Sequence, residues 1–218
     1  VQTYGRTVVT ALFSLLNLEF ADATQEAQGE GHVQTAEKIV ETIHQVAWDG
    51  DLQGYRFNPD EKGLYFYPNV VMMLAYGRLY RMTGKQEYLD RSLLLYQTVQ
   101  ALKDASQGSY HTPYSQEVMG AQTDDYKTLS AHNYMLLALL VLYENTHDPK
   151  WLAEVDSILA FIHDHLLSDG MVLHHWMDGK PAQPEHLEYY CTGCNFQLLY
   201  AIRYYWKLLE TRDEDGTY

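Results

Sequence analysis

The sequence predicts an all-α protein built from helical hairpins, and three observations support this fold class. Apolar residues recur at helical spacing in seven long segments. The stretches that alternate in the manner of β-strands are all short. A block of two helices, a short turn and a long loop repeats along the chain, as in helical-hairpin arrays.

The predicted helices are separated by recognisable turn residues. Thr83-Gly84 ends one helix, because glycine readily adopts the left-handed conformation found after a helix C-terminus. Asp148 and Pro149 begin another, as its N-cap and its first helical residue. We predict helices over residues 6–27, 31–49, 68–83, 86–105, 129–146, 149–167 and 192–211.

Three long loops, rich in aromatic residues and glycine, cover residues 50–67, 106–126 and 168–191. Each contains short alternating stretches that predict a small β-hairpin, and in the first loop we expect residues 54–57 to pair with residues 63–66. Since the short turns lie at one end of the hairpins and the long loops at the other, functional residues are expected on the long-loop face.

The repeat has an offset of 63 residues. The same offset places Asn69, His132 and Asn195 at the starts of three helices, and Arg6 at the corresponding place in the first. We predict one domain over residues 1–218, which can be part of a longer chain because the sequence begins with valine. The matched pairs are Tyr80 and Tyr143, Thr83 and Thr146, Tyr88 and Trp151, Leu89 and Leu152, and His111 and His174.

Composition and charge exclude several functions. With 218 residues, 46% of them hydrophobic, the chain can bury a core without disulfide bonds or metals. A net charge of −14 and the lack of a basic run argue against nucleic acid and anionic membranes as partners. The longest apolar run, residues 135–143, is about half a membrane span, and no signal peptide is recognisable. We therefore expect a soluble chain, and the compartment stays open.

Two segments, residues 67–100 and 131–164, resemble the α/α-toroid superfamily of six-hairpin glycosidase-like proteins. The run ALLVLYENTHDPKWL at residues 138–152 is similar to a phrase in N-acylglucosamine 2-epimerases and in the helical domain of spermatogenesis-associated thioredoxin-like proteins. The resemblance implies an α/α toroid. A complete toroid has more helices than the seven predicted here, so we expect a partial ring, or a ring that a second chain or a missing segment completes.

The resemblance also suggests where chemistry could take place. In the epimerases this helix opens with His-x-His and carries a glutamate; here His132 matches the first histidine, while Tyr134 and Leu137 stand at the other two positions. Some toroid glycosidases have an adjacent aspartate pair, which Asp124-Asp125 resembles.

Glycoside hydrolysis uses two carboxyl groups, one as an acid and the other as a base or nucleophile. Among the loop carboxylates, Asp124, Asp125 and Glu188 stand closest to helix starts and are the predicted catalytic residues. His132 joins them because an imidazole can exchange protons near neutral pH. The alternative for each carboxylate is a solvated surface position.

Sugar sites combine aromatic faces with polar groups, and the chain has 19 tyrosines. The alternative for the polar residues at helix starts is N-capping and interhelical hydrogen bonding, and for the rings it is covering the ends of the helices. The predicted substrate-binding residues are Arg6, Tyr67, Asn69, Tyr110, His174, Trp176, Tyr189 and Asn195.

The two cysteines, Cys191 and Cys194, have C-x-x-C spacing at a helix start. We expect two free thiols, with a local disulfide or a redox pair as alternatives. We predict no metal or other cofactor. The alternative is zinc bound by His186, Cys191 and Cys194, with His174 or His175 as a fourth ligand.

Together these patterns predict a carbohydrate-active protein, with glycoside hydrolysis by loop carboxylates as the leading hypothesis. One alternative is a non-catalytic helical-repeat module that binds a glycan, a peptide or a protein. A sugar epimerase or isomerase is the other. The expected partner is a carbohydrate or another small polar ligand.

Overall fold

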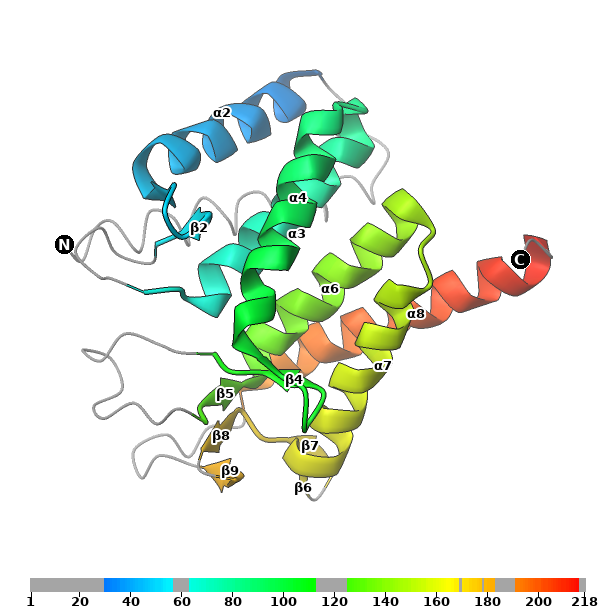
Figure 1. Cartoon of the computed structure of the whole chain (residues 1–218). Helices are drawn as coiled ribbons and strands as arrows, with labels where there is room; N and C mark the ends of the chain where they lie inside the picture. The colour runs from blue at the N-terminus through cyan, green and yellow to red at the C-terminus, as the bar shows by residue number, and fades with distance from the viewer. Residues whose placement is uncertain are drawn as a thin grey trace. The chain divides into compact units, whose positions relative to one another are not determined.

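The computed structural model describes residues 30–56, 63–112, 125–168, 170–177, 179–182 and 191–215. The chain forms two compact units, Val1–Ala101 and Leu102–Tyr218 (Figure 1). Helices dominate both units and the strands are two or three residues long, so the predicted all-α class with short hairpins is confirmed. The predicted helix over residues 6–27 lies outside the described residues.

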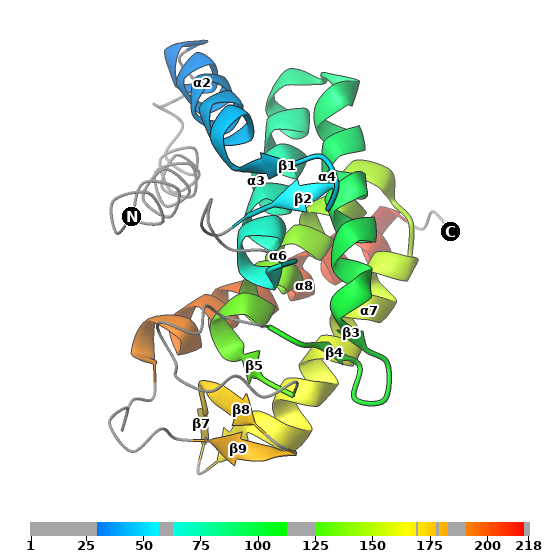
Figure 2. The same ribbon diagram turned by 60° about the vertical axis from the view of Figure 1, so that its left-hand side comes forward.

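The first unit joins one helix, a short hairpin and a helical hairpin. Helix α3 packs against both α2 and α4, and its side chains from Val70 to Leu79 are buried. Figure 2 shows the β1–β2 hairpin directly after α2. The elements of this unit are α2 (Glu30–Ala47), β1 (Trp48–Asp49), β2 (Gly54–Tyr55), α3 (Phe66–Thr83) and α4 (Gln86–Val99), followed by the 3₁₀ helix η1 (Gln100–Leu102).

The α3–α4 turn follows the prediction from Thr83-Gly84. Gly84 is the C-cap of α3, with a φ of 67° in the left-handed region, and its N–H donates to the carbonyl of Tyr80 at 2.7 Å. Ser92 of α4 then donates to the carbonyl of Met73 at 2.9 Å. This buried bond fixes the register of the two helices, because a slip along the axis would leave the serine hydroxyl unpaired.

The second unit places three helices beside several short strands. Helix α6 packs against α7 and α8, and its residues from Ala131 to Tyr143 are buried. The elements of the second unit are β3 (Lys103–Asp104), β4 (Ser109–Tyr110), β5 (Lys127–Thr128), α6 (Leu129–Thr146), α7 (Lys150–Phe161), the π-helix η2 (Ile162–Leu166), β6 (Leu167–Ser168), β7 (Met171–Val172), β8 (His175–Met177), β9 (Lys180–Ala182) and α8 (Thr192–Asp215).

Strand β5, which immediately precedes α6, belongs to a three-stranded antiparallel sheet in the order β5-β8-β9. Lys127 pairs with Trp176 and Thr128 with His175, so the last long loop folds back on the start of α6. The Leu129 N–H donates to the carbonyl of His174 at 2.9 Å and continues this pairing.

Several helix boundaries differ from the prediction. The predicted bounds of the helix over residues 129–146 are confirmed. The helices expected to reach residues 105 and 167 end earlier as regular α-helices, and each continues as a short helix of another type. The predicted pairing of residues 54–57 with 63–66 is wrong, because Gly54–Tyr55 pairs with Trp48–Asp49 across a tight turn.

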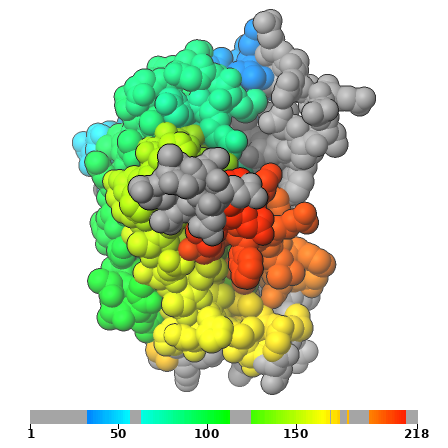
Figure 3. Space-filling view, turned by 90° about the vertical axis from the view of Figure 1, so that its right-hand side faces the viewer, coloured from blue at the N-terminus to red at the C-terminus, as the bar shows by residue number. Residues whose placement is uncertain are grey.

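Helix α8 lies beside α7, as Figure 3 shows, and Tyr205 of α8 donates to Asp156 of α7 at 2.7 Å. It also presents large apolar side chains to solvent, among them Phe196 and Trp206, which are 68% and 65% exposed. Among the described residues, no helix is long and apolar enough to cross a membrane.

Candidate active site

The three polar residues of the repeat have the same structural role. In each case the side chain accepts a hydrogen bond from a backbone N–H in the second strand of a hairpin earlier in the chain. Tyr55 donates to Asn69 at 2.7 Å, Tyr110 to His132 at 3.1 Å, and Val172 to Asn195 at 3.0 Å. Each side chain also donates to the carbonyl four residues before it, with distances of 2.6, 2.7 and 3.2 Å. We call this arrangement the strand clamp.

The strand clamp explains why an asparagine or a histidine recurs every 63 residues. Both side chains combine a donor and an acceptor, which the clamp uses together. The alternative of N-capping and interhelical hydrogen bonding is therefore wrong in its partners, because all three side chains bind a hairpin strand. Their predicted contacts with a substrate stay untested, and Asn69 and His132 are completely buried.

His132 has a defined tautomer, because its two partners differ. The Tyr110 N–H can only donate, so Nε2 is the acceptor and Nδ1 carries the proton that goes to the Thr128 carbonyl. Burial, together with the nearby charge of Lys127, lowers the pKa of His132 to about 4, although the bond to Thr128 opposes this shift. At neutral pH the ring is neutral and both nitrogens are engaged.

The contribution of the strand clamp to stability can be measured directly in the first unit, by replacing Asn69. Asn69→Ala removes the partners of the Tyr55 N–H and carbonyl and of the Tyr65 carbonyl. Since each buried unpaired group costs about 1–3 kcal/mol, we expect a loss of roughly 2–4 kcal/mol in the free energy of unfolding, measured in urea. Gln86→Ala, which removes an exposed hydrogen bond to Asp90, should change it by less than about 0.5 kcal/mol.

Asp125, one of the predicted catalytic residues, lies two residues before β5 and is held by groups from more than one segment. Lys127 Nζ forms an ion pair with its Oδ1, and the Gly179 N–H donates to its Oδ2 at 2.8 Å. The side chain of Asp125 stays 31% exposed. One face of a firmly oriented carboxylate therefore remains open to solvent on the long-loop side.

Lys127 is the charged residue that the sequence analysis missed. Its side chain is completely buried, and its Nζ contacts Asp104 at 3.0 Å and Gln107 at 3.0 Å as well as Asp125. Burial raises the pKa of Asp104, but hydrogen bonds from Ser106 and Lys127 outweigh it and lower that pKa to about 2. The ammonium group is thus shared by two carboxylates, as a buried charge requires.

His111 lies beside the same carboxylate. Its Nδ1 is 3.8 Å from Asp125 Oδ1, and its ring is 34% exposed. Its backbone N–H donates to the Leu102 carbonyl at 2.8 Å, which fixes its position after the β3–β4 hairpin. In the sequence, His111 is marked only by its alignment with His174 in the repeat. That alignment is the sequence signal that could have placed His111 in the site.

Tyr110 is fully buried, and its hydroxyl donates to Glu154, which also accepts from Lys103 at 2.6 Å. The structure thus gives Tyr110 a role in packing the β3–β4 hairpin against α7, without the exposed face that stacking on a sugar needs. Tyr67 is partly exposed near the start of α3. Trp176 lies in β8 opposite Lys127.

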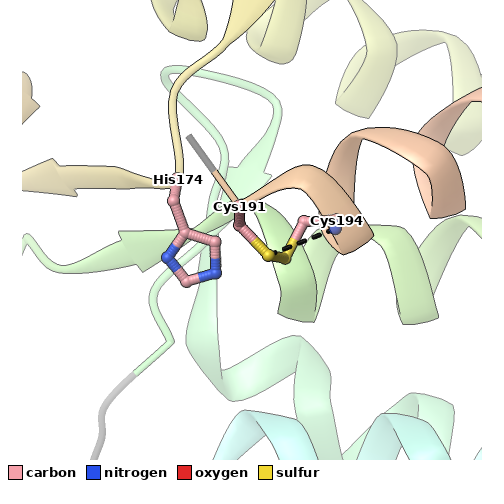
Figure 4. A group of neighbouring side chains, drawn as sticks. All are labelled: His174, Cys191 and Cys194. Atoms are coloured by element: carbon pink, nitrogen blue, oxygen red, sulfur yellow. Dashed lines mark hydrogen bonds between the residues drawn. A yellow bond between two sulfur atoms is a disulfide. The ribbon is translucent and has the colours of Figure 1, made fainter. Parts of the chain in front are cut away.

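The expectation of two free thiols is wrong. Cys191 and Cys194 form a disulfide, with 5.1 Å between their Cα atoms, which is the local-disulfide alternative. The spacing of three residues at a helix start allows this bond, but the sequence alone did not select it. His174 lies next to the disulfide, as Figure 4 shows. His174 therefore belongs to the cysteine cluster, and Asn195 clamps the strand that precedes it.

The other predicted site residues lie outside the described residues, and their roles stay predictions. They are Arg6, Asp124, His186, Glu188 and Tyr189.

Helical hairpins with long loops at one end are the architecture of the α/α-toroid class. A family model described as Glycosyl hydrolase family 76 matches residues 7–184, and the chain therefore belongs to this family. The search of curated proteins found no match.

Solved structures show the same fold at low sequence identity. A family 76 mannosidase from Bacteroides thetaiotaomicron has a TM-score of 0.70 at 16% identity, covering 95% of this chain and 56% of its own. An inactive variant of an α-1,6-mannanase from Salegentibacter, in complex with α-1,6-mannotriose, has a TM-score of 0.67 at 14% identity. The match covers 94% of this chain and 54% of the mannanase. Cellobiose 2-epimerase from Spirochaeta thermophila has a TM-score of 0.63 at 16% identity, and the match covers 82% of this chain and 47% of the epimerase. The chain spans about half the length of these proteins.

Proposed function

We propose that the protein is a glycoside hydrolase that cleaves α-1,6-linked mannose chains, with Asp124 and Asp125 as its two catalytic carboxyl groups. The observation that carries this proposal is the aspartate pair. Residues 124 and 125 are the only two consecutive aspartates in the sequence. The Salegentibacter mannanase was made inactive by replacing two consecutive aspartates, and the variant is in complex with α-1,6-mannotriose.

The proposed reaction needs one carboxyl group to protonate the leaving glycosidic oxygen and another, ionised, to activate water or to attack the anomeric carbon. Asp124 and Asp125 share these two roles. If the ionised group attacks, a covalent glycosyl intermediate forms, and water then releases it with help from the first residue. If it activates water, the product forms in one step.

Lys127 supports this chemistry as a positioning residue. It fixes the Asp125 carboxylate from the buried side, while the Gly179 N–H holds the second oxygen. Because catalytic groups must be held within fractions of an ångström of the productive geometry, this orientation is part of the proposed mechanism.

Epimerisation receives less support from the same residues. His132 is the one position that matches the epimerase pattern, and both of its ring nitrogens are used by the strand clamp. Tyr134 and Leu137, which stand at the other two positions, are each 4% exposed. A buried neutral imidazole with both nitrogens engaged is not placed to move a proton of a sugar.

A substrate comparison tests the proposed specificity. The native protein is incubated with α-1,6-mannotetraose and with β-1,4-mannotetraose, and the products are separated by chromatography. We expect shorter α-1,6-linked oligomers and an intact β-1,4-linked substrate. Cleavage of neither oligomer, or of the β-1,4-linked one alone, would contradict the proposal.

A further inference from the structure

The neighbourhood of the disulfide contains three donor atoms that could bind a metal ion. The sulfur atoms of Cys191 and Cys194 and a ring nitrogen of His174 all lie within 4.8 Å of one another. Figure 4 shows the imidazole facing the disulfide at the start of α8. One imidazole and two thiolates are ligands that zinc accepts in tetrahedral sites, whereas the sulfurs of a disulfide are bonded to each other and supply no thiolate.

The backbone that carries these residues is held independently of the disulfide. Asn133 of α6 donates to the Cys194 carbonyl at 2.8 Å, and Asn195 binds both the N–H and the carbonyl of Val172 at 3.0 Å. The His174 carbonyl accepts from Leu129. Opening the S–S bond would therefore leave the three side chains on fixed segments, as a preorganised site requires.

The local electrostatics suit a metal ion once the cysteines are reduced. Cys191 directly precedes α8, and its Sγ accepts the Cys194 N–H at 3.1 Å, so the helix start stabilises a thiolate at this position. Neutral imidazole and thiolate are the forms that bind metals. Cys191 and His174 are partly exposed, which leaves an entry path.

We propose that this chain carries a redox-gated site for a soft divalent cation such as Zn²⁺, formed by His174, Cys191 and Cys194 when the disulfide is reduced. A dithiol reductant supplies two electrons and two protons, which break the S–S bond into two thiols, and is itself oxidised to a disulfide. Zn²⁺ binding then releases the two thiol protons. Two Zn–S bonds and one Zn–N bond form, and a water molecule takes the fourth position.

Cobalt binding tests the proposal on the native protein, because Co²⁺ reports tetrahedral thiolate coordination by its visible and charge-transfer bands. The protein is reduced with a phosphine, desalted without oxygen and titrated with Co²⁺, and Zn²⁺ is then added to displace it. We expect one Co²⁺ per reduced chain and no such bands for the oxidised protein. Absence of these bands in the reduced wild type would overturn the proposal.

Variants separate this site from adventitious binding. His174→Ala should weaken Co²⁺ binding at least about 100-fold, since even the loss of a group behind a metal ligand costs 10- to 100-fold. Cys191→Ser with Cys194→Ser, which keeps His174, should abolish the charge-transfer band. His163→Ala is the matched control, because that ring is 75% exposed and contacts Asp164. Equal affinity of His174→Ala and the wild type would contradict the assignment.

Discussion

Replacing Asp124 and Asp125 together by asparagine is expected to lower kcat for α-1,6-mannotetraose by at least about 1,000-fold. Removing one general acid or base costs about 10²- to 10⁴-fold, and the pair supplies both roles of the hydrolysis. The Asp125→Asn substitution alone is expected to lower kcat by a factor within that range. The measurement is the initial rate of product formation at saturating substrate, with the substrate affinity of the inactive variant followed by calorimetry.

The fold should survive these substitutions, because an asparagine at position 125 keeps one oxygen that can accept from Lys127, and the Lys127 ammonium group keeps Asp104 as its second partner. Asp164→Asn is the control carboxylate; it is 63% exposed and lies outside the proposed pair. Full activity of the double variant, with a control variant that behaves like the wild type, would exclude the aspartate pair from catalysis.

His132→Asn is expected to remove a large part of the acid sensitivity of the fold. The pKa of the buried His132 is about 4, whereas an unfolded histidine has a pKa near 6.5. The unfolded state therefore binds a proton at a higher pH than the folded state does. The stabilisation is complete above about pH 6.5 and is lost as the pH falls towards 4, amounting to about 3 kcal/mol.

Asparagine is the matched replacement, because Asn69 and Asn195 occupy the corresponding positions of the strand clamp. Urea unfolding at several pH values between 7 and 4 measures the difference in free energy of unfolding between the two proteins. We expect this difference to shift by about 3 kcal/mol in favour of the variant as the pH falls. A constant difference would show that His132 is not a buried neutral group.

The helices could be predicted because their apolar spacing and their turn residues are local signals. Helix α6 extends on both sides of the apolar run at residues 135–143, from Leu129 to Thr146. The ends of α4 and α7 were harder to predict from the sequence, because their last turns change from α-helical to other hydrogen-bond patterns. Strand pairing could not be predicted either, since Gly54–Tyr55 has the alternating pattern of a strand and could pair with the segment before it or the segment after it.

The site was predicted only in part. Asp125 stood out through its neighbour Asp124 and its place before a helix. The burial of Lys127 could not be inferred, because a single lysine in a loop gives no local sign of the carboxylates that other segments bring to it. The repeat marked Asn69, His132 and Asn195 correctly as equivalent, and the structure shows that the equivalence concerns the clamping of a strand.

The central claim is that this protein hydrolyses glycosidic bonds, and mass spectrometry of α-1,6-mannotetraose products formed in H₂¹⁸O tests it most directly. Hydrolysis places one oxygen atom from water in each pair of products, whereas an epimerase or an isomerase leaves the chain length unchanged. We expect shortened oligomers in which the new reducing end carries a single ¹⁸O in the first turnovers. An oligomer of unchanged length, whether epimerised or simply bound, would contradict the account.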